Sequence, residues 1–320
     1  MRNRRPTYDL LAIGNLTLDM IHEVDRIPNL DETGLVFHSN VCFGGRAGNI
    51  ALTGALLDLD VAVASIVGDD FVASGYKDYL LRHKVNIDRV KIFNTKKSAG
   101  IHVYRRRDRK HIYFFQPNAI KHSKSLDLER EDVLRFRVIY LTSLNSGSLI
   151  TSLMTKIEQL SGVFFGFGEE IYRKSKSFLK SAIKISSYVN LNAAEFEILR
   201  TKLKISSIAE MFHIGDKLEF LSVSLGEKGS VIYIPNSKYF IPAVPPDKFV
   251  SSLGAGDAYV AGLIYGIVNR WSTKDSGRLG SVLSSFILES EGAQNAFLKW
   301  DTIRDRYEQF FGELPRDQEQ

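Results

Sequence analysis

The segment 251–262, SSLGAGDAYVAG, places two glycines and an aspartate directly before an apolar run. We expect the backbone N–H groups of Gly254, Ala255 and Gly256 to converge at the start of a helix, where the helix dipole favours a bound anion. Asp257 follows in the first turn, so it could act as the general base of a phosphoryl transfer while these N–H groups stabilise the transferred charge. An aspartate that the dipole stabilises in an ordinary first turn explains the segment equally well.

A second pair of glycines precedes another expected helix, in FGGRAGN at 43–49. Gly44 and Gly45 allow the backbone to approach a ligand closely, although a glycine turn that merely caps a helix is the simpler alternative. A dinucleotide-binding fold would require G-x-G-x-x-G immediately after the first strand. Here the first strand ends in GNLTLD, and the glycines come roughly thirty residues later. The pattern G-x-x-x-x-G-K-S/T does not occur, so the sequence argues against a Rossmann dehydrogenase and excludes a P-loop enzyme.

Two weaker signals involve carboxylates. Asp19 ends GNLTLD at 14–19, where it could accept hydrogen bonds from a polyhydroxyl ligand, but a turn aspartate is the more ordinary interpretation. Asn192 and Glu195 have the spacing of a helix N-cap and its capping-box partner, which is the favoured interpretation. The alternative places Glu195 near a hydrated Mg²⁺ and its phosphates.

The segment LSVSLGEKGSVIYI at 221–234 predicts two strands joined by a tight turn around Gly226 and Gly229. A hairpin explains these glycines fully. They would also let a nucleotide lie against the backbone.

Strand-like and helix-like segments alternate along the chain and must position these residues. We expect strands at 9–14, 61–68, 138–143, 162–166, 188–192 and 218–226. Helices are expected at 47–59, 70–83, about 149–160 and about 170–184, with several more across 194–213 and a mostly helical end from 258 to 306. This alternation predicts an α/β fold with a mostly parallel central sheet between two helical layers.

Two insertions, at about 20–40 and 87–117, alternate with period two instead. They predict a small antiparallel sheet that serves as a lid over a site at the strand ends. No linker-like change in composition separates the lid from the rest, so we expect one domain over 1–320. An exposed lid sheet needs its edge and apolar face covered, which favours a homodimer.

Composition narrows the class of protein. The 320 residues are 44% hydrophobic and 25% charged, as in ordinary globular proteins. Cys42 is the single cysteine, so an internal disulfide is impossible and a reducing compartment, the cytoplasm, is expected. No apolar run approaches the roughly 20 residues of a membrane span. The basic run YRRRDRKH at 104–111 is interpreted as a hairpin tip or an anion-binding lid rather than a nucleic-acid site.

Five motifs in order resemble one known family. GNLTLD, FGGRAGN, LNAAEFEIL, SVSLGEKGS and LGAGDAYVAG follow one another as in the ribokinase-like (phosphofructokinase-B-type) kinases of sugars and nucleosides. The resemblance extends from Asp9 to about Phe310. It implies a three-layer α/β/α body, a β-sheet lid, ATP as donor, Mg²⁺, and phosphorylation of a hydroxymethyl group.

The resemblance also implies roles for individual residues. Asp257 would be the catalytic base, with Gly254, Ala255 and Gly256 as its anion hole. The substrate would be contacted by Asp19, Gly44, Gly45 and Asn49. Asn192 and Glu195 would form an N-x-x-E element for Mg²⁺ and the phosphates. The turn near the nucleotide would contain Ser224, Gly226 and Gly229.

Within this family the chain resembles the archaeal broad-specificity nucleoside kinases, through GDDFVASGYKDYL at 68–80, YFF at 113–115 and EGAQ at 291–294. Thr17 stands where sugar kinases often carry asparagine, which favours a nucleoside. Phe43, Phe114 or Phe115 could stack on its base, or could form a small core of the lid. The prediction is therefore transfer of the ATP γ-phosphate to a nucleoside 5′-hydroxyl. A sugar kinase is the alternative, and a non-catalytic ligand-binding paralogue is the third interpretation.

The sequence departs from the family pattern at two places. Ser251 occupies the position of a usual aspartate, which argues against the family's monovalent-cation site. GVFFGFGEE lacks the aspartate-proline expected near Gly166 and Phe167, so substrate recognition there should differ.

Overall fold

The computed structural model describes residues 7–317 except 109, 127, 143–159, 161 and 297. In this part of the chain nine strands form one sheet, in the spatial order β13 (Ser237–Ile241), β12 (Ser230–Ile234), β11 (Phe220–Ser224), β10 (Tyr188–Asn192), β9 (Val163–Gly166), β8 (Phe136–Thr142), β1 (Tyr8–Ile13), β4 (Val61–Gly68) and β5 (Asn86–Phe93). The strands from β11 to β5 are parallel, and β12 and β13 add an antiparallel edge. The strands expected from the sequence are confirmed, whereas the helix expected at about 149–160 falls almost entirely outside the described residues.

The order of the strands creates a switch point beside β1. From β1 the chain adds β4 and β5 on one side, and it then returns to add β8, β9, β10 and β11 on the other. In sheets of this kind, ligands bind in the crevice outside the carboxyl ends of the strands where the direction of addition reverses. That crevice lies between the ends of β1 and β8.

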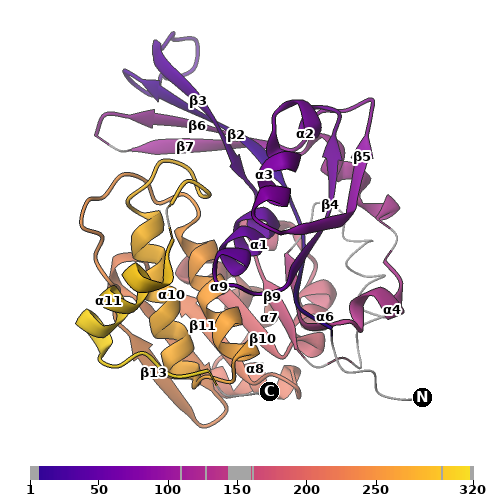
Figure 1. Cartoon of the computed structure of the whole chain (residues 1–320), viewed down its shortest axis with the longest axis vertical. Coiled ribbons are helices and arrows are strands. Elements are labelled where there is room, and N and C mark those ends of the chain that lie inside the picture. Colours follow the sequence, from indigo (N-terminus) through magenta and orange to yellow (C-terminus); the bar gives the residue numbers. More distant parts are fainter. Residues whose placement is uncertain are drawn as a thin grey trace.

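Both faces of the sheet are covered, because β1 alternates between two cores. Leu10 and Ala12 belong to one buried cluster, and Leu11 and Ile13 belong to the other. The first cluster packs under α1 (Arg46–Leu56), α3 (Tyr76–Arg82), α9 (Ala255–Val268), α10 (Thr273–Ile287) and α11 (Trp300–Phe311). The second packs under α6 (Lys176–Ile185), α7 (Ala193–Leu203), α8 (Ile208–Ile214) and the 3₁₀ helix η1 (Asn118–Ser125). The expected three-layer α/β/α body is confirmed (Figure 1).

Two expected helices are interrupted. The helix expected at 70–83 is α2 (Asp70–Ala73) followed by α3, because Gly75 between them has a left-handed φ of 82°. The helix expected near 170–184 is the 3₁₀ helix η2 (Glu169–Arg173) followed by α6, whose N-cap Ser175 accepts a hydrogen bond from the Phe178 N–H. The short helices α4 (Arg130–Val133) and η3 (Gly226–Lys228) lie in connections.

The lid differs from its prediction in two respects. Four strands form it, in the order β3 (Val36–Gly44), β2 (Thr17–Val24), β6 (Gly100–Arg106) and β7 (His111–Gln116). The prediction of a lid over 87–117 is wrong at its start, because β5 pairs with β4 in the main sheet. None of the β5 side chains is fully buried, as is typical of a strand at the edge of a sheet. The lid sheet is also mixed rather than antiparallel, since β2 pairs in parallel with β6. The long connection between these strands permits that pairing.

The lid rests on the loop that precedes α9. Ile21, Cys42 and Val103 form a small core, against which Leu253 of the body packs. The Arg105 guanidinium in β6 lies 2.6 Å from a Glu291 carboxylate oxygen of the body. In Figure 1 the lid strands project from the upper edge of the body. Of the helices in the described ranges, none combines the length and apolarity that a membrane crossing requires.

Candidate active site

The N-terminus of α9 carries the strongest sequence signal. Gly254 has a φ of 86°, and a Cβ atom on it would lie 2.2 Å from the Ala293 Cβ, so only glycine fits there. Among the described residues, a Cβ on Gly256 would meet nothing within 4 Å. The Ala255 N–H donates to the Ser252 carbonyl at 3.3 Å, whereas the N–H groups of Gly254 and Gly256 have no acceptor among the described residues. Two of the three expected anion donors therefore remain available.

Asp257 receives a short hydrogen bond from the opposite side of the crevice. The Asn49 Nδ2, on α1, donates to the Asp257 Oδ2 at 2.6 Å. Burial raises the pKa of Asp257, while the Arg46 charge and the Asn49 hydrogen bond act to lower it. A carboxylate with a raised pKa and a fixed orientation has the properties of a general base. The structure thus brings together Asn49 and Asp257, which lie 208 positions apart.

Arg46 is a site residue that the sequence reasoning missed. Its guanidinium donates to the Phe167 carbonyl and lies 3.5 Å from the Glu195 Oε1. Burial acts to lower the pKa of Arg46, but the neighbouring Tyr140, Asp257 and Glu195 outweigh burial and raise it. The guanidinium is therefore a permanent cation in the crevice. The sequence FGGRAGN contained a hint of this role. It places Arg46 in the first turn of a helix, where the helix dipole disfavours a cation unless other partners hold it there.

Asn192 and Glu195 form the capping box that the spacing predicts. The Glu195 N–H donates to the Asn192 Oδ1 at 2.8 Å, and the Asn192 N–H donates to the Glu195 Oε2 at 2.9 Å. The other Glu195 oxygen faces Arg46. With both oxygens engaged, Glu195 suits a contact to a hydrated cation through water rather than direct ligation. Among the described residues, no three His, Cys, Asp or Glu side chains gather as metal ligands. Mg²⁺ that takes its ligands mainly from phosphates and water is compatible with this arrangement.

Asp19 is 1% exposed and lies against the start of α1. A Cβ on Gly44 would be 2.1 Å from the Asp19 Oδ2, and one on Gly45 would be 2.4 Å from the Asn15 carbonyl oxygen, so both positions require glycine. Burial raises the pKa of Asp19 to about 6, partly opposed by the Thr17 hydroxyl beside it and the N–H of Ile101. The charge of Asp257 raises this pKa further, so the two carboxyl groups share one crevice.

The predicted nucleotide residues lie along the next strand ends. Ser224 pairs in register with Asn192, and its hydroxyl donates to the Leu191 carbonyl at 3.3 Å. Gly226 has a φ of 63° and open space beside its Cα. Gly229 is explained by the fold alone, because a Cβ there would lie 2.1 Å from the Ile241 carbonyl oxygen. These residues form a row beside Asn192, with no described contact to Asp257.

The aromatic candidates separate into two groups. The Phe43 ring stacks on the Tyr76 ring with centroids 4.5 Å apart, so one of its faces is occupied by protein. Phe114 and Phe115 are exposed on β7 of the lid, at 58% and 41%. Stacking of Phe115 on a substrate base stays a prediction.

The loop that contains Ser251 is joined to the segment after α10, since the Ser251 N–H donates to the Leu288 carbonyl at 3.2 Å. The Ser251 Oγ accepts a hydrogen bond from the Leu253 N–H. The Arg306 guanidinium lies 2.8 Å from both an Asp247 oxygen and a Glu289 oxygen, on the two loops next to it. The Arg306 guanidinium therefore ties these two segments together. That the chain lacks the family's monovalent-cation site, as expected from Ser251, stays a prediction.

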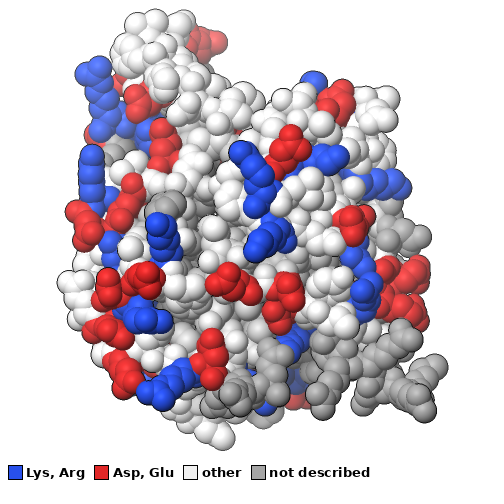
Figure 2. All heavy atoms as spheres, in the orientation of Figure 1, with Lys and Arg blue, Asp and Glu red and all other residues white. Residues whose placement is uncertain are grey.

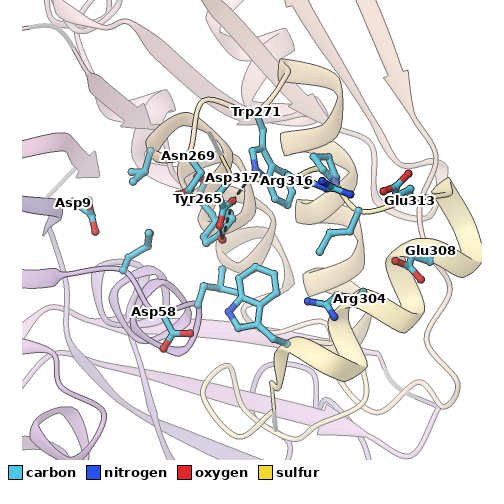
Figure 3. A pocket seen from close by; sticks show the side chains of 16 residues that line it. Asp9, Asp58, Tyr265, Asn269, Trp271, Arg304, Glu308, Glu313, Arg316 and Asp317 are labelled. Carbon is cyan, nitrogen blue, oxygen red and sulfur yellow. Dashed lines mark hydrogen bonds between the residues drawn. The ribbon is translucent and has the colours of Figure 1, made fainter. Parts of the chain in front are cut away.

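A cavity of about 720 Å³ lies at the other end of α9 and is not this site. Figure 3 shows Tyr265 and Trp271 hydrogen-bonded to Asp317, with Asp58 and Arg304 across the cavity. Five carboxylates and two guanidinium groups line it, which disfavours a triphosphate. None of the predicted site residues takes part in its lining.

The chain is similar to known proteins in both sequence and fold. The sequence model of the pfkB family carbohydrate kinases matches residues 8–300. The chain is 28% identical to a nucleoside kinase of Methanocaldococcus jannaschii over 302 residues, which are 93% of this chain and 96% of the relative. It is 27% identical to a nucleoside kinase of Methanothermobacter thermautotrophicus, over 89% of this chain and 91% of the relative.

The solved structures agree with the sequence relatives. The crystal structure of the M. jannaschii nucleoside kinase, an archaeal member of the ribokinase family, superposes with a TM-score of 0.87 at 26% identity, covering 96% of this chain and all of that one. A Burkholderia thailandensis nucleoside kinase in complex with inosine superposes with a TM-score of 0.86 at 24% identity, covering 96% and 98%. The second likeness concerns the fold alone.

Proposed function

Because the chain belongs to the pfkB family of carbohydrate kinases, it is a phosphotransferase with an alcohol group as acceptor, and we propose that it transfers the γ-phosphate of ATP to the 5′-hydroxyl of a nucleoside. The observation that carries this proposal is the Asp257 carboxylate. It stands at the N-terminus of α9 beside two free N–H groups, and Asn49 orients it.

The proposed chemistry follows from these neighbours. Asp257 takes the proton of the acceptor hydroxyl while that oxygen bonds to the γ-phosphorus and the bond to the bridging oxygen of ADP breaks. The N–H groups of Gly254 and Gly256 face the charge on the transferred group. Arg46 adds a fixed positive charge in the same crevice. The N–H of Ala255 already donates to the Ser252 carbonyl, so in this proposal Ala255 is part of the helix start but not an anion donor.

The acceptor would bind between α1 and the lid. Asp19 is the group that would accept hydrogen bonds from ribose hydroxyls, with the backbone at Gly44 and Gly45 and the side chain of Asn49 beside it. Thr17 is adjacent to the Asp19 carboxylate. The choice of a nucleoside rests on Thr17 and on the two relatives that are nucleoside kinases over nearly the whole chain.

ATP would lie along the ends of β10 and β11, next to Asn192, Ser224, Gly226 and Gly229. Mg²⁺, when bound, neutralises charge on the phosphates. Glu195 would hold it through water, and Arg46 fixes the orientation of Glu195.

We also propose that two copies pair through their lids. Many exposed large apolar side chains belong to the lid, namely Leu30, Leu35, Val36, Phe37, Val41, Tyr113, Phe114 and Phe115. On the face shown in Figure 2 much of the projecting tip of the lid is white, although the β2–β3 connection also carries Asp25, Arg26, Asp31 and Glu32. The described part of the basic run 104–111 includes the end of β6 and the start of β7, where Arg105 pairs with Glu23 and Arg106 with Asp108. A second copy would cover the apolar face.

An acceptor panel tests the proposed function. The protein is assayed with Mg-ATP and inosine, adenosine, guanosine or cytidine, and in parallel with ribose, fructose and a sugar acid. We expect turnover of nucleosides to 5′-monophosphates and no turnover of 5′-deoxyadenosine, which lacks the acceptor oxygen. Turnover of sugars alone would replace the proposal by a sugar kinase. Thermal stabilisation by nucleosides without ATP consumption would replace it by a ligand-binding paralogue.

A further inference from the structure

A buried glutamine, Gln294, hydrogen-bonds to Asn49, the residue that holds the proposed base Asp257. Gln294 is 3% exposed, and its Nε2 lies 3.0 Å from the Asn49 Oδ1 and 2.7 Å from the Tyr76 hydroxyl. The Asn49 Nδ2 in turn donates to Asp257 at 2.6 Å. Gln294 itself has no described contact with Asp257, so any effect on the base passes through Asn49.

These residues form a series of hydrogen bonds that runs from Asp257 to the Gly44 carbonyl. Because the groups at both ends of the series can only accept, they determine the direction of each hydrogen bond between them. The ionised Asp257 can only accept, so Asn49 must turn its amide NH₂ toward it and its Oδ1 away. The Gly44 carbonyl can also only accept, and the Tyr76 hydroxyl donates to it at 2.8 Å. Gln294 must therefore donate both hydrogens of its Nε2, one to Asn49 and one to Tyr76.

The segment 291–294, which carries Gln294, also contacts the start of α9 and the lid. Ala293 packs against Gly254, the first residue of the anion site. Glu291 accepts from Arg105 of the lid at 2.6 Å. This segment is therefore held between the lid and the start of α9, which keeps Gln294 in one position.

We propose that Gln294 is a positioning residue for phosphoryl transfer, which fixes the Asn49 amide so that its NH₂ group, and not its oxygen, faces Asp257. The inference rests on the proposed function, because it assigns Gln294 to the base of that reaction. Without the donor from residue 294, the Asn49 amide is free to rotate and the hydrogen bond to Asp257 weakens.

The consequence appears in the pH dependence. The Asn49 hydrogen bond lowers the pKa of Asp257, so its loss raises that pKa and moves the acid limb of kcat to higher pH. Of the other titratable groups that face Asp257, Arg46 of α1 lowers its pKa, whereas Asp257 itself raises the pKa of Asp19 on β2 and of Tyr140 on β8. A substitution at Gln294 leaves all three in place.

Two variants of Gln294 test the proposal. Gln294→Met keeps the volume without donors, and Gln294→Glu is nearly isosteric but accepts, so it would turn the Asn49 oxygen toward Asp257. The best nucleoside of the acceptor panel is used from pH 5 to 9, and a melting curve checks that each variant is folded. We expect kcat at neutral pH to fall roughly 10-fold with little change in KM. The acid limb should move to higher pH in both variants, and further in Gln294→Glu.

The outcomes separate this inference from the proposed function. An unmoved acid limb in both folded variants would overturn the positioning role and leave Gln294 as a packing residue. The double variant Asn49→Leu/Gln294→Met should be no worse than Asn49→Leu alone, and an additive loss would also contradict the proposal. If Asp257→Asn retains full turnover, the proposed function itself fails, independently of Gln294.

Discussion

Asp19 and Asp257 are two carboxyl groups in one crevice with different environments. Asp19 is fully enclosed, with a pKa of about 6, whereas Asp257 is partly exposed and is held by Asn49 and Arg46. The environment of Asp257 favours proton transfer. The environment of Asp19 suits a carboxylate that accepts hydrogen bonds from the hydroxyl groups of a ligand, because those bonds would stabilise its charged form.

The raised pKa of Asp19 predicts a measurable effect on stability. A folded-state pKa of about 6 lies above the usual value for aspartate, so the folded state binds the proton more tightly and the ionised group destabilises the free protein above pH 6. This destabilisation is relieved as the pH falls from about 6 toward 4. Asp19→Asn should therefore raise the free energy of unfolding at pH 7.5 by on the order of 1 kcal/mol, with the difference vanishing near pH 4.

Denaturant unfolding at the two pH values measures this, with Asp305→Asn on the exposed side of α11 as the control. The same Asp19→Asn change should raise the acceptor KM strongly. Lower stability at pH 7.5 than the wild type would contradict the account of Asp19.

At this scale the sequence predicted residues better than it predicted their contacts. Asp257 was predicted from the glycines beside it, Asp19 from its place at a strand end, and Asn49 from the resemblance to the family. The pairing of Asn49 with Asp257 could not be predicted, since it joins α1 to α9 across the sheet. Arg46 was overlooked because its partners, Phe167 and Glu195, come from other strand ends.

At the scale of elements, the start of α9 offers a matched pair of glycines. Gly254→Ala would place a methyl group 2.2 Å from the Ala293 Cβ at a φ of 86°, so it should destabilise the fold. Gly256→Ala meets no described atom within 4 Å and has no unusual φ, so the protein should melt within about 2 °C of the wild type. Its methyl group would instead enter the space where the transferred phosphate is proposed to lie.

We therefore expect Gly256→Ala to reduce kcat/KM for ATP by on the order of 10-fold or more while folding normally. Thermal melting and steady-state kinetics of both variants provide the comparison. Full activity of Gly256→Ala would argue that no anion occupies the start of α9.

Among the elements, long buried strands and capped helices were predictable, and the edge strand β5 was not. None of its side chains is fully buried, and the same is true of the lid strand β7. Only pairing with β4 distinguishes the two, and pairing is a long-range property.

At the scale of the whole molecule, the exposed lid predicts an oligomer. Val41 on β3 is 63% exposed, and Phe240 on β13 of the body is similarly exposed at 59%. We expect a wild-type dimer by sedimentation, a monomer for Val41→Asp, and an unchanged dimer for the control Phe240→Asp. A wild-type monomer at micromolar concentration would contradict the pairing of lids.

The alternation of strands and helices in the sequence predicted the overall architecture, but it did not predict that the lid sheet is mixed. The parallel pairing of β2 with β6 joins segments separated by α1, β4 and β5, and local sequence does not encode it. The attachment of the lid to the body through Arg105 and Glu291 is likewise visible only in three dimensions.

The central claim is that the carboxylate of Asp257 is the base of phosphoryl transfer in this kinase. The most direct measurement is the kcat of Asp257→Asn with Mg-ATP and the best nucleoside, together with the stabilisation that the nucleoside gives in melting experiments. We predict a loss of kcat on the order of 10²-fold or more with nucleoside binding retained. Turnover close to that of the wild type would contradict the claim.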